Sequence, residues 1–227
     1  DDFLIERTTL KRVFHRPKPD PLNPILKTSG SDRLFAIPFS DGVWYDPADH
    51  RYKMFYFGGN NNAVALATSI DGKTWIRPSI PDAENPGSNA VISLSGRDSS
   101  TVWMDLTSSA KKFRAFVYTG GNRLSSFHSP DGIHWTRDVF QIPSVSDRTT
   151  MFWNPWRQRW VESTRSSVLL PASDTRQARD SRVRYYSESQ DLVTWTPEQD
   201  TMFWSGPDED DPPYPGYSGH FPELYNL

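Results

Sequence analysis

Short runs of aromatic and β-branched residues recur along the chain, separated by clusters of Gly, Pro, Asp, Asn and Ser. The runs at residues 52–57 and 113–118 are typical examples. No stretch places its apolar residues three and four positions apart, which is the spacing of an amphipathic helix. Runs of this composition, bounded by turn residues, favour β-strands. The pattern therefore predicts an all-β fold.

One turn motif returns at a constant interval. The sequence Ser-Ile-Asp-Gly-Lys-Thr-Trp occupies residues 69–75, and related stretches at 129–135 and 189–195 each begin 60 residues after the one before. The Ser and Asp side chains hydrogen-bond the backbone of a tight turn, and Gly supplies the positive φ that such a turn needs. A fixed period of this size indicates a repeat architecture. We expect the acidic residues of the three turns to be structural, namely Asp71, Asp131 and Asp191.

Each repeat holds four predicted strands. They lie at residues 42–46, 52–57, 63–67 and 74–77, then 101–105, 113–118, 124–127 and 134–136, then 150–155, 159–163, 183–186 and 194–195. Four short antiparallel strands per repeat are typical of the blades of a β-propeller. A closed propeller of five such blades needs about 300 residues, so this chain is expected to supply about three and a half of them. The remainder would lie in a second chain or in a missing segment.

The predicted organisation is a single propeller domain over residues 1–227. Residues 1–40 carry closely spaced prolines, which forbid a helix and suit an extended segment. The blades are predicted at residues 41–80, 97–140 and 146–200, and the start of a fourth at 220–227. A polar stretch at 167–181 is expected to be a surface loop inserted into the third blade.

Composition excludes several classes of function. The net charge of −3 gives no electrostatic reason to expect a nucleic acid or an anionic membrane as partner. The chain has no Cys, which excludes disulfides and thiolate zinc sites, and no apolar run is long enough to span a bilayer. No cofactor is expected. The acidic run from Asp208 to Asp211 has oxygen ligands that suit Ca²⁺, but the prolines after it favour a solvated loop.

Several stretches together resemble one superfamily: residues 1–5, 23–26, 52–56 and 208–213, and the Ser-x-Asp-Gly-x-x-Trp turns. They are similar to bacterial proteins of the five-bladed β-propeller glycoside hydrolases, which include families 32, 43, 62, 68 and 130. The resemblance implies a secreted or periplasmic hydrolase that cleaves glycosidic bonds in a plant or algal poly- or oligosaccharide. The chain departs from the fructosyl hydrolases, because it lacks their Arg-Asp-Pro and Trp-Met-Asn-Asp-Pro signatures; Arg97-Asp98 is a partial match.

The resemblance also implies where the catalytic carboxylates lie, in a funnel on the propeller axis at the innermost strands of successive blades. On this basis Asp41 would be the base or nucleophile, and Asp98 and Asp147 would orient the substrate or modulate pKa. Glu223 would be the acid, with Glu162 as the alternative. Glycoside hydrolysis needs one carboxylate and one protonated acid, and crowded acids push their pKa values apart. The alternative for each aspartate is a cap at the end of a strand.

Other residues near the inner strands are candidates for binding the carbohydrate substrate. The tryptophans would stack on sugar rings or pack between blades, the arginines would bind a sugar carboxylate or pair with the neighbouring Asp, and the histidine would line the funnel or be structural. These candidates are Trp44, Arg97, Trp103, Arg148, Trp153 and His220.

Two other functions stay open at this point. A glycoside phosphorylase of the family 130 kind would need basic groups at the funnel floor, for which Arg97, Arg148 and Arg165 are the candidates. A non-catalytic carbohydrate-binding propeller would have an aromatic pocket without two facing carboxylates.

Overall fold

The computed structural model describes residues 15–28, 36–58, 63–81, 87–93, 100–118, 121–142, 148–170, 179–197 and 202–206, with the single residues 9, 11, 13 and 146. Every regular element in this part of the chain is a β-strand. None of the described residues forms a helix long and apolar enough to cross a membrane. The prediction of an all-β fold is thus confirmed.

The strands form three antiparallel meanders of four. The first contains β1 (Ala36–Asp46), β2 (Arg51–Gly58), β3 (Ala63–Ser69) and β4 (Ala90–Ile92). The second contains β5 (Ser100–Met104), β6 (Phe113–Tyr118), β7 (Leu124–Ser129) and β8 (Thr136–Ile142). The third contains β9 (Thr150–Asn154), β10 (Arg159–Leu170), β11 (Arg179–Ser189) and β12 (Met202–Ser205).

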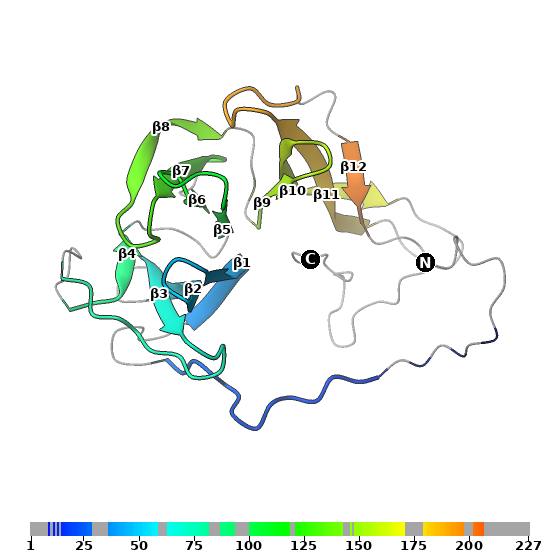
Figure 1. Cartoon of the computed structure of the whole chain (residues 1–227). Coiled ribbons are helices and arrows are strands. Elements are labelled where there is room, and N and C mark those ends of the chain that lie inside the picture. The colour runs from blue at the N-terminus through cyan, green and yellow to red at the C-terminus, as the bar shows by residue number, and fades with distance from the viewer. Residues whose placement is uncertain are drawn as a thin grey trace.

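These meanders, here called blades 1, 2 and 3, radiate from a common centre, with β1, β5 and β9 innermost (Figure 1). One parallel pairing, Ser40 with Thr101, joins β1 to β5. The backbone N–H of Met151 donates to Thr101 Oγ1 at 3.2 Å and so ties β9 to β5. Four-stranded antiparallel sheets around an axis are the blades of a β-propeller. The predicted fold class and the predicted innermost strands are confirmed.

The outermost strands were predicted wrongly in blades 1 and 3. Residues 74–77 and 194–195 contribute only the isolated bridges Thr68 to Ile76 and Ser189 to Trp195, and the outer strands are β4 and β12. Pro78 and Pro197 lie two residues after the bridging residues Ile76 and Trp195, and proline cannot donate to a strand ladder. Blade 2 has no proline between its turn and Ile142, so β8 begins at once.

The predicted polar insertion at 167–181 is partly strand. β10 and β11 pair from Trp160 opposite Ser189 to Leu170 opposite Arg179, so that only residues 171–178 separate them. Polar side chains on this hairpin do not interrupt the ladder because its backbone groups are paired. Blade 3 therefore extends further than the other two at this end.

The repeated turn has the predicted structure in all three blades. In the first, Asp71 Oδ1 accepts the backbone N–H groups of Lys73 (2.8 Å) and Thr74 (2.7 Å), and these donors hold the pKa of Asp71 well below its usual range. The indole Nε1 of Trp75 donates to the Gly72 carbonyl at 3.1 Å. The same contacts recur at Asp131 with Trp135 and at Asp191 with Trp195. The interpretation of the turn aspartates as structural is confirmed.

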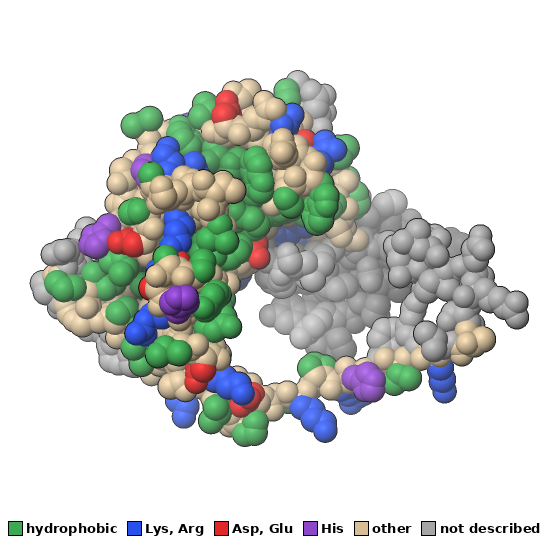
Figure 2. All heavy atoms as spheres, viewed as in Figure 1, with side chains coloured by type: hydrophobic (Ala, Val, Ile, Leu, Met, Phe, Trp, Pro, Cys, Tyr) green, Lys and Arg blue, Asp and Glu red, His purple; other side chains and the backbone are tan. Residues whose placement is uncertain are grey.

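Hydrophobic side chains fill the spaces between the blades (Figure 2). Between blades 1 and 2, Phe55 packs against Phe113 and Trp135, with ring centroids 5.7 and 5.9 Å apart. Between blades 2 and 3, Trp160 packs edge-on against Phe116 at 5.5 Å. Buried aromatic pairs in these orientations add stability beyond the area that they bury. The tryptophan-rich composition is thus largely explained by blade packing.

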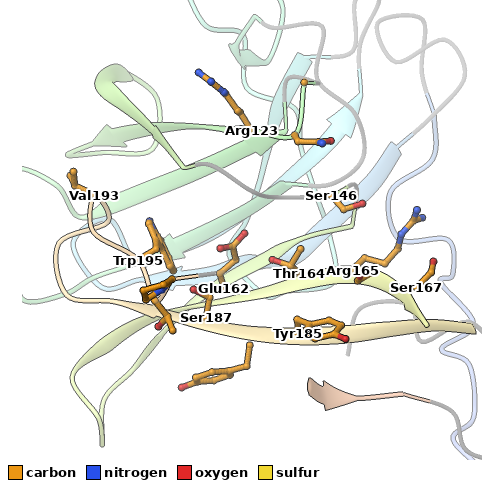
Figure 3. Close-up of a pocket in the computed structure, with 16 residues that line it drawn as sticks. Arg123, Ser146, Glu162, Thr164, Arg165, Ser167, Tyr185, Ser187, Val193 and Trp195 are labelled. Carbon is orange, nitrogen blue, oxygen red and sulfur yellow. The ribbon is translucent and has the colours of Figure 1, made fainter. Parts of the chain in front are cut away.

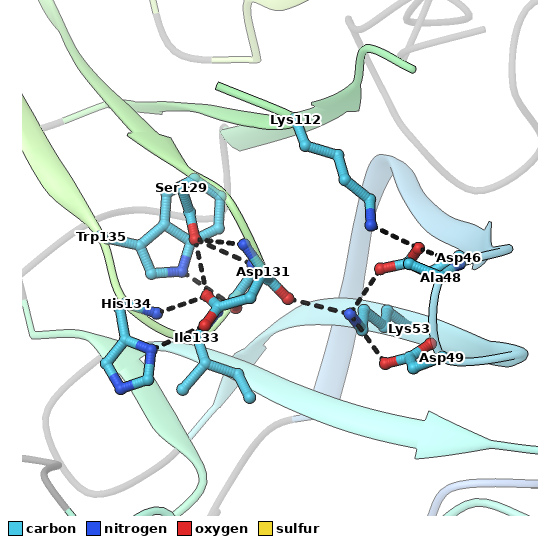
Figure 4. A network of polar contacts seen from close by, with 11 residues as sticks. Asp46, Ala48, Asp49, Lys53, Lys112, Ser129, Asp131, Ile133, His134 and Trp135 are labelled. Carbon is cyan, nitrogen blue, oxygen red and sulfur yellow. Dashed lines mark hydrogen bonds and ion pairs between the residues drawn. The ribbon is translucent and has the colours of Figure 1, made fainter. Parts of the chain in front are cut away.

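A buried ionic network ties blades 1 and 2 at the end of the inner strands (Figure 4). Asp46, 1% exposed, accepts ion pairs from Lys53 (2.7 Å) and from Lys112 of blade 2 (2.5 Å). Lys53 also reaches Asp49 at 3.0 Å and the carbonyl of Asp131 at 2.9 Å. Burial alone would raise the pKa of Asp46, but the hydrogen bonds from the two lysines outweigh it and lower the pKa. This network fixes the two blades together.

Candidate functional site

Several predicted site residues lie outside the described residues, and their roles stay predictions. They are Asp98, Asp147, Glu223, Arg97 and His220, together with the acidic run from Asp208 to Asp211. Among the residues that the structure does describe, no three His, Asp or Glu side chains gather closely enough to hold a metal ion.

Asp41 lies on a bulge of the inner strand of blade 1. Pro38 pairs with Tyr56 and Val43 with Met54, so the residues between Pro38 and Val43 have no partners in the ladder between β1 and β2. Asp41 has a φ of +53°, a left-handed conformation that is uncommon for a residue with a Cβ. Its side chain keeps contact with solvent, yet partial burial raises its pKa. Asp visits this conformation more readily than most residues, and the role of Asp41 as base or nucleophile stays a prediction.

Two neighbours hold this bulge in place. A Cβ on Gly42 would lie 2.6 Å from the carbonyl oxygen of Phe55, so only glycine allows the close approach to β2. The indole Nε1 of Trp44 donates to the carbonyl of Asp41 at 2.5 Å and to that of Val102 in blade 2 at 2.8 Å. Trp44 therefore supports Asp41 through the backbone.

The other two tryptophans of the inner strands also pack between blades. Trp103 lies 5.0 Å from Trp44 and 6.4 Å from Trp160, and Trp153 lies 5.4 Å from Trp160, as distances between ring centroids. These edge-on contacts link the inner strands of all three blades. The packing alternative is what the structure provides for Trp44, Trp103 and Trp153, and their stacking on a sugar stays a prediction.

Arg148 is the remaining candidate for substrate binding among the described residues. It precedes β9 and has a φ of +63°. Its carbonyl accepts a hydrogen bond from Arg184, whose buried guanidinium also donates to the carbonyl of Ser163 at 3.3 Å. These bonds fix the start of β9 against the neighbouring strands of blade 3. The predicted contact between Arg148 and a sugar stays a prediction.

A cavity of about 1070 Å³ opens between blades 2 and 3 (Figure 3). Its wall is rich in hydroxyl groups, and it also contains two arginines, a tryptophan and one carboxylic acid. The lining residues are Gly121, Asn122, Arg123, Ser146, Glu162, Thr164, Arg165, Ser166, Ser167, Tyr185, Tyr186, Ser187, Val193, Trp195, Thr196 and Pro197. Asp41 is not among them, so the cavity does not bring Asp41 and Glu162 together.

Glu162 is the buried acid of this cavity. It lies on β10 between Met151 of β9 and Ser187 of β11, and its side chain is among the cavity-lining groups in Figure 3. Only 3% of the residue is exposed, and its Oε1 atom has no hydrogen-bond partner among the residues that the structure describes. Burial raises its pKa to about 8, although a hydrogen bond from Thr164 acts in the opposite direction. At neutral pH Glu162 is therefore largely protonated and can donate a proton.

At the cavity, the second strand of blade 3 differs from the second strands of blades 1 and 2 in the side chains that it buries. Tyr52, Phe113 and Trp160 pair with the first Ser of the respective turn, so they occupy equivalent positions. Two residues further along the strand, blades 1 and 2 have the buried apolar side chains of Met54 and Ala115, and blade 3 has Glu162.

The position two residues further along each of these strands differs in the same way. Tyr56 and Val117 are buried there in blades 1 and 2, whereas blade 3 has Thr164. Sequence reasoning named Glu162 only as an alternative acid and missed Thr164, Ser187 and Arg123. Aligning the second strands on the repeated turn would have indicated the two polar positions on β10.

No family model and no curated protein matches the sequence. Its backbone is similar to that of a fructofuranosidase from Schwanniomyces occidentalis complexed with fructose, at 14% identity and a TM-score of 0.45, over 74% of this chain and 35% of that one. A glycosyl hydrolase from Bacteroides ovatus matches at 17% identity and a TM-score of 0.39, over 71% and 49%. An α-L-arabinofuranosidase from Fusarium graminearum in complex with an iminosugar inhibitor matches at 12% identity and a TM-score of 0.39, over 78% and 54%.

These neighbours are glycosidases, the class of enzyme that the sequence resembles. The chain spans between a third and about half of the length of each. Such identities and TM-scores are too low to assign an activity, and the propeller fold rests on the strand order and blade packing described above.

Proposed function

We propose that the chain belongs to an enzyme that hydrolyses glycosidic bonds, with Glu162 as the proton donor to the leaving oxygen. The observation that carries the proposal is a buried carboxylic acid with a raised pKa, in a cavity whose wall is rich in hydroxyl groups and contains aromatic rings beside two arginines. Hydroxyl groups and aromatic faces are what a carbohydrate substrate needs from its binding site. A raised pKa is how an enzyme keeps a general acid protonated at neutral pH.

The second carboxylate of the reaction is proposed from the sequence. Asp41 would act on the anomeric carbon or on a water molecule as the base or nucleophile. Asp98 and Asp147 would orient the substrate or modulate pKa, and Asp147 follows Ser146, a lining residue of the cavity, in the chain. Glu223 is the alternative acid.

The test is the hydrolysis of a panel of aryl glycosides and oligosaccharides by the wild type and by Glu162→Gln. Removing a general acid costs about 10²- to 10⁴-fold in rate. The loss should be largest for poor leaving groups such as alcohols and smallest for acidic phenols, which depart without a proton. Glu188→Gln is the matched control, because Glu188 lies on the neighbouring strand in an ion pair with Arg157 and does not line the cavity. An equal loss for all leaving groups would show that Glu162 is not the acid.

A phosphorylase is the second candidate, because two cations, Arg123 and Arg165, line the same cavity. Inorganic phosphate would then take the place of water, and the cations would bind it. Release of a sugar phosphate in the presence of phosphate, with no turnover in its absence, would favour this reaction over hydrolysis. Binding of oligosaccharides with no turnover in either condition would leave a non-catalytic carbohydrate-binding protein.

A further inference from the structure

The wall of the cavity between blades 2 and 3 has an apolar strip beside a polar one. Val193, Trp195 and Pro197 lie at alternate positions of the segment after β11, and all three line the cavity. Glu162 and Ser187 line it from β10 and β11. Ligand pockets combine apolar and aromatic side chains, which contact the body of a ligand, with a few polar groups that fix its orientation. A sugar ring suits such a wall, because its faces carry C–H groups and its hydroxyl groups lie along its edge.

Strand pairing places Trp195 on the same face of blade 3 as the acid. Trp195 forms an isolated bridge with Ser189, and Ser189 pairs with Trp160 on β10. Opposed residues of neighbouring antiparallel strands point to one face, and so do residues two apart on a strand. Glu162 follows Trp160 by two residues, so the indole and the carboxyl project from the same face (Figure 3). This face looks toward blade 2, where Phe116 contacts Trp160.

The orientation of the Trp195 indole is fixed by the repeated turn. Its Nε1 donates to the carbonyl of Leu192 at 3.0 Å, and Asp191 holds the backbone N–H groups of Val193 and Thr194. The bond to Leu192 uses the only polar group of the ring, so a ligand meets the indole through its apolar surface. A side chain that is already held in place loses little conformational entropy when a ligand binds to it.

The equivalent tryptophan of blade 2 has a different environment. Trp135 makes the same bond within its turn, but its ring packs edge-on against Phe55 of blade 1, with centroids 5.9 Å apart. Phe116 has the position of Phe55 in the next blade, and its ring contacts Trp160 at 5.5 Å. Trp195 is half-buried beside the apolar cluster of blades 2 and 3, and no ring contact joins it to another aromatic side chain in the described part of the chain. The indole that lines the cavity is therefore the one that a ligand can cover.

We propose that Trp195 is the platform on which a sugar ring of the substrate stacks, and that this ring presents an apolar face of C–H groups. Ser187 lies on β11, between Glu162 on β10 and the segment that carries Trp195, so its hydroxyl group is placed to bond the edge of the stacked ring. The inference rests on the proposed function, because it names a binding residue and the kind of sugar for the same cavity.

The test measures binding separately from turnover, using the full chain with Glu162→Gln, which keeps the size of the side chain. Calorimetric titrations use neutral gluco-, galacto-, manno- and arabino-oligosaccharides. Trp195→Leu removes the aromatic face, and Trp195→Phe keeps one but loses the bond to Leu192. Trp135→Leu is the matched control, because it removes an indole from the same turn of blade 2, outside the lining of the cavity.

We expect at least one of these oligosaccharides to bind, and Trp195→Leu to weaken its binding by about tenfold or more. Trp195→Phe should keep most of the affinity, and Trp135→Leu should leave it unchanged. The oligosaccharide that binds identifies the sugar. Equal affinity of Trp195→Leu and its parent, an equal loss in Trp135→Leu, or no binding of any of the oligosaccharides would overturn the proposal.

A second measurement does not depend on the folding of Trp195→Leu. In protein labelled with fluorotryptophan, the fluorine NMR signal that is missing from Trp195→Phe belongs to Trp195. This signal should shift when the bound oligosaccharide is added, because the sugar ring covers the indole. A Trp195 signal that stays in place at saturation would contradict the stacking.

The two proposals fail separately. Binding that depends on Trp195, without turnover by the wild type, would leave the stacking platform intact and remove the hydrolysis. Turnover that depends on Glu162, with no effect of Trp195→Leu on binding, would do the reverse.

Discussion

Replacing Glu162 by Gln should change how the stability of the protein depends on pH. In the folded protein Glu162 has a pKa of about 8, against an ordinary value of 4.5. Between these values the folded state keeps a proton that the unfolded state releases. The free energy of unfolding of the wild type therefore falls as the pH rises through this interval. Gln has nearly the same shape and does not titrate, so the variant lacks this contribution.

The size of the effect follows from the pKa difference. A shift from 4.5 to about 8 corresponds to roughly 5 kcal/mol of unfolding free energy over the whole interval. The full difference applies because Glu162 is only 3% exposed and solvent hardly screens it. Since domains are typically stable by only about 5–15 kcal/mol, the loss is easily measured.

The assay is denaturant unfolding, followed by tryptophan fluorescence, at several values between about pH 5 and about pH 9. Relative to the wild type, Glu162→Gln should become progressively more stable as the pH rises. Glu188→Gln is the control: the hydrogen bond from Arg157 lowers the pKa of Glu188, so it titrates below this range. Its difference from the wild type should stay constant.

Parallel pH curves for the wild type and Glu162→Gln would refute the reasoning. Glu162 would then be ionised in the folded protein, and it could not serve as a general acid at neutral pH. The proposed proton donor would have to be sought elsewhere, with Glu223 as the remaining candidate.

Two further substitutions test the packing of the blades. Asp46→Asn should lower the free energy of unfolding by about 3–5 kcal/mol in urea at neutral pH, because Lys53 and Lys112 lose their buried counterion; a loss below about 1 kcal/mol would contradict the assigned network. Gly132→Ala should cost about 1–3 kcal/mol by the same measurement, because Gly132 has a φ of +80° and a Cβ would lie 2.9 Å from Cζ of Phe55. An unchanged unfolding midpoint for this variant would show that the turn does not lie as close to Phe55 of blade 1 as the structure has it.

The repeated turn was predictable because its contacts are local. Asp71 bonds backbone groups two and three residues further on, and Trp75 bonds a carbonyl three residues back. Such geometry depends on residue type and spacing, both of which the sequence displays. The blade architecture followed from the period of these turns.

The outer strands were harder to predict, because their position depends on long-range pairing. β4 and β12 contain no recurring motif. A proline after each isolated bridge prevents a strand from continuing there, so the outer strand forms further along the chain. The first blade thus extends to Ile92, beyond its predicted end at residue 80. Whether a short segment pairs with the edge of a sheet depends on its tertiary context, which local patterns do not display.

The cavity could have been anticipated only by comparing the blades with one another. A carboxylate on a strand usually faces solvent, so the residues around Glu162 in the sequence do not indicate that it is buried. It becomes significant because the equivalent positions hold Met54 and Ala115, both buried in apolar clusters. A buried carboxyl with an unpartnered oxygen costs stability, and an apolar side chain fits the same position in two blades of the same chain. Proteins retain such local violations chiefly at functional sites, and this is the strongest reason to look for chemistry between blades 2 and 3.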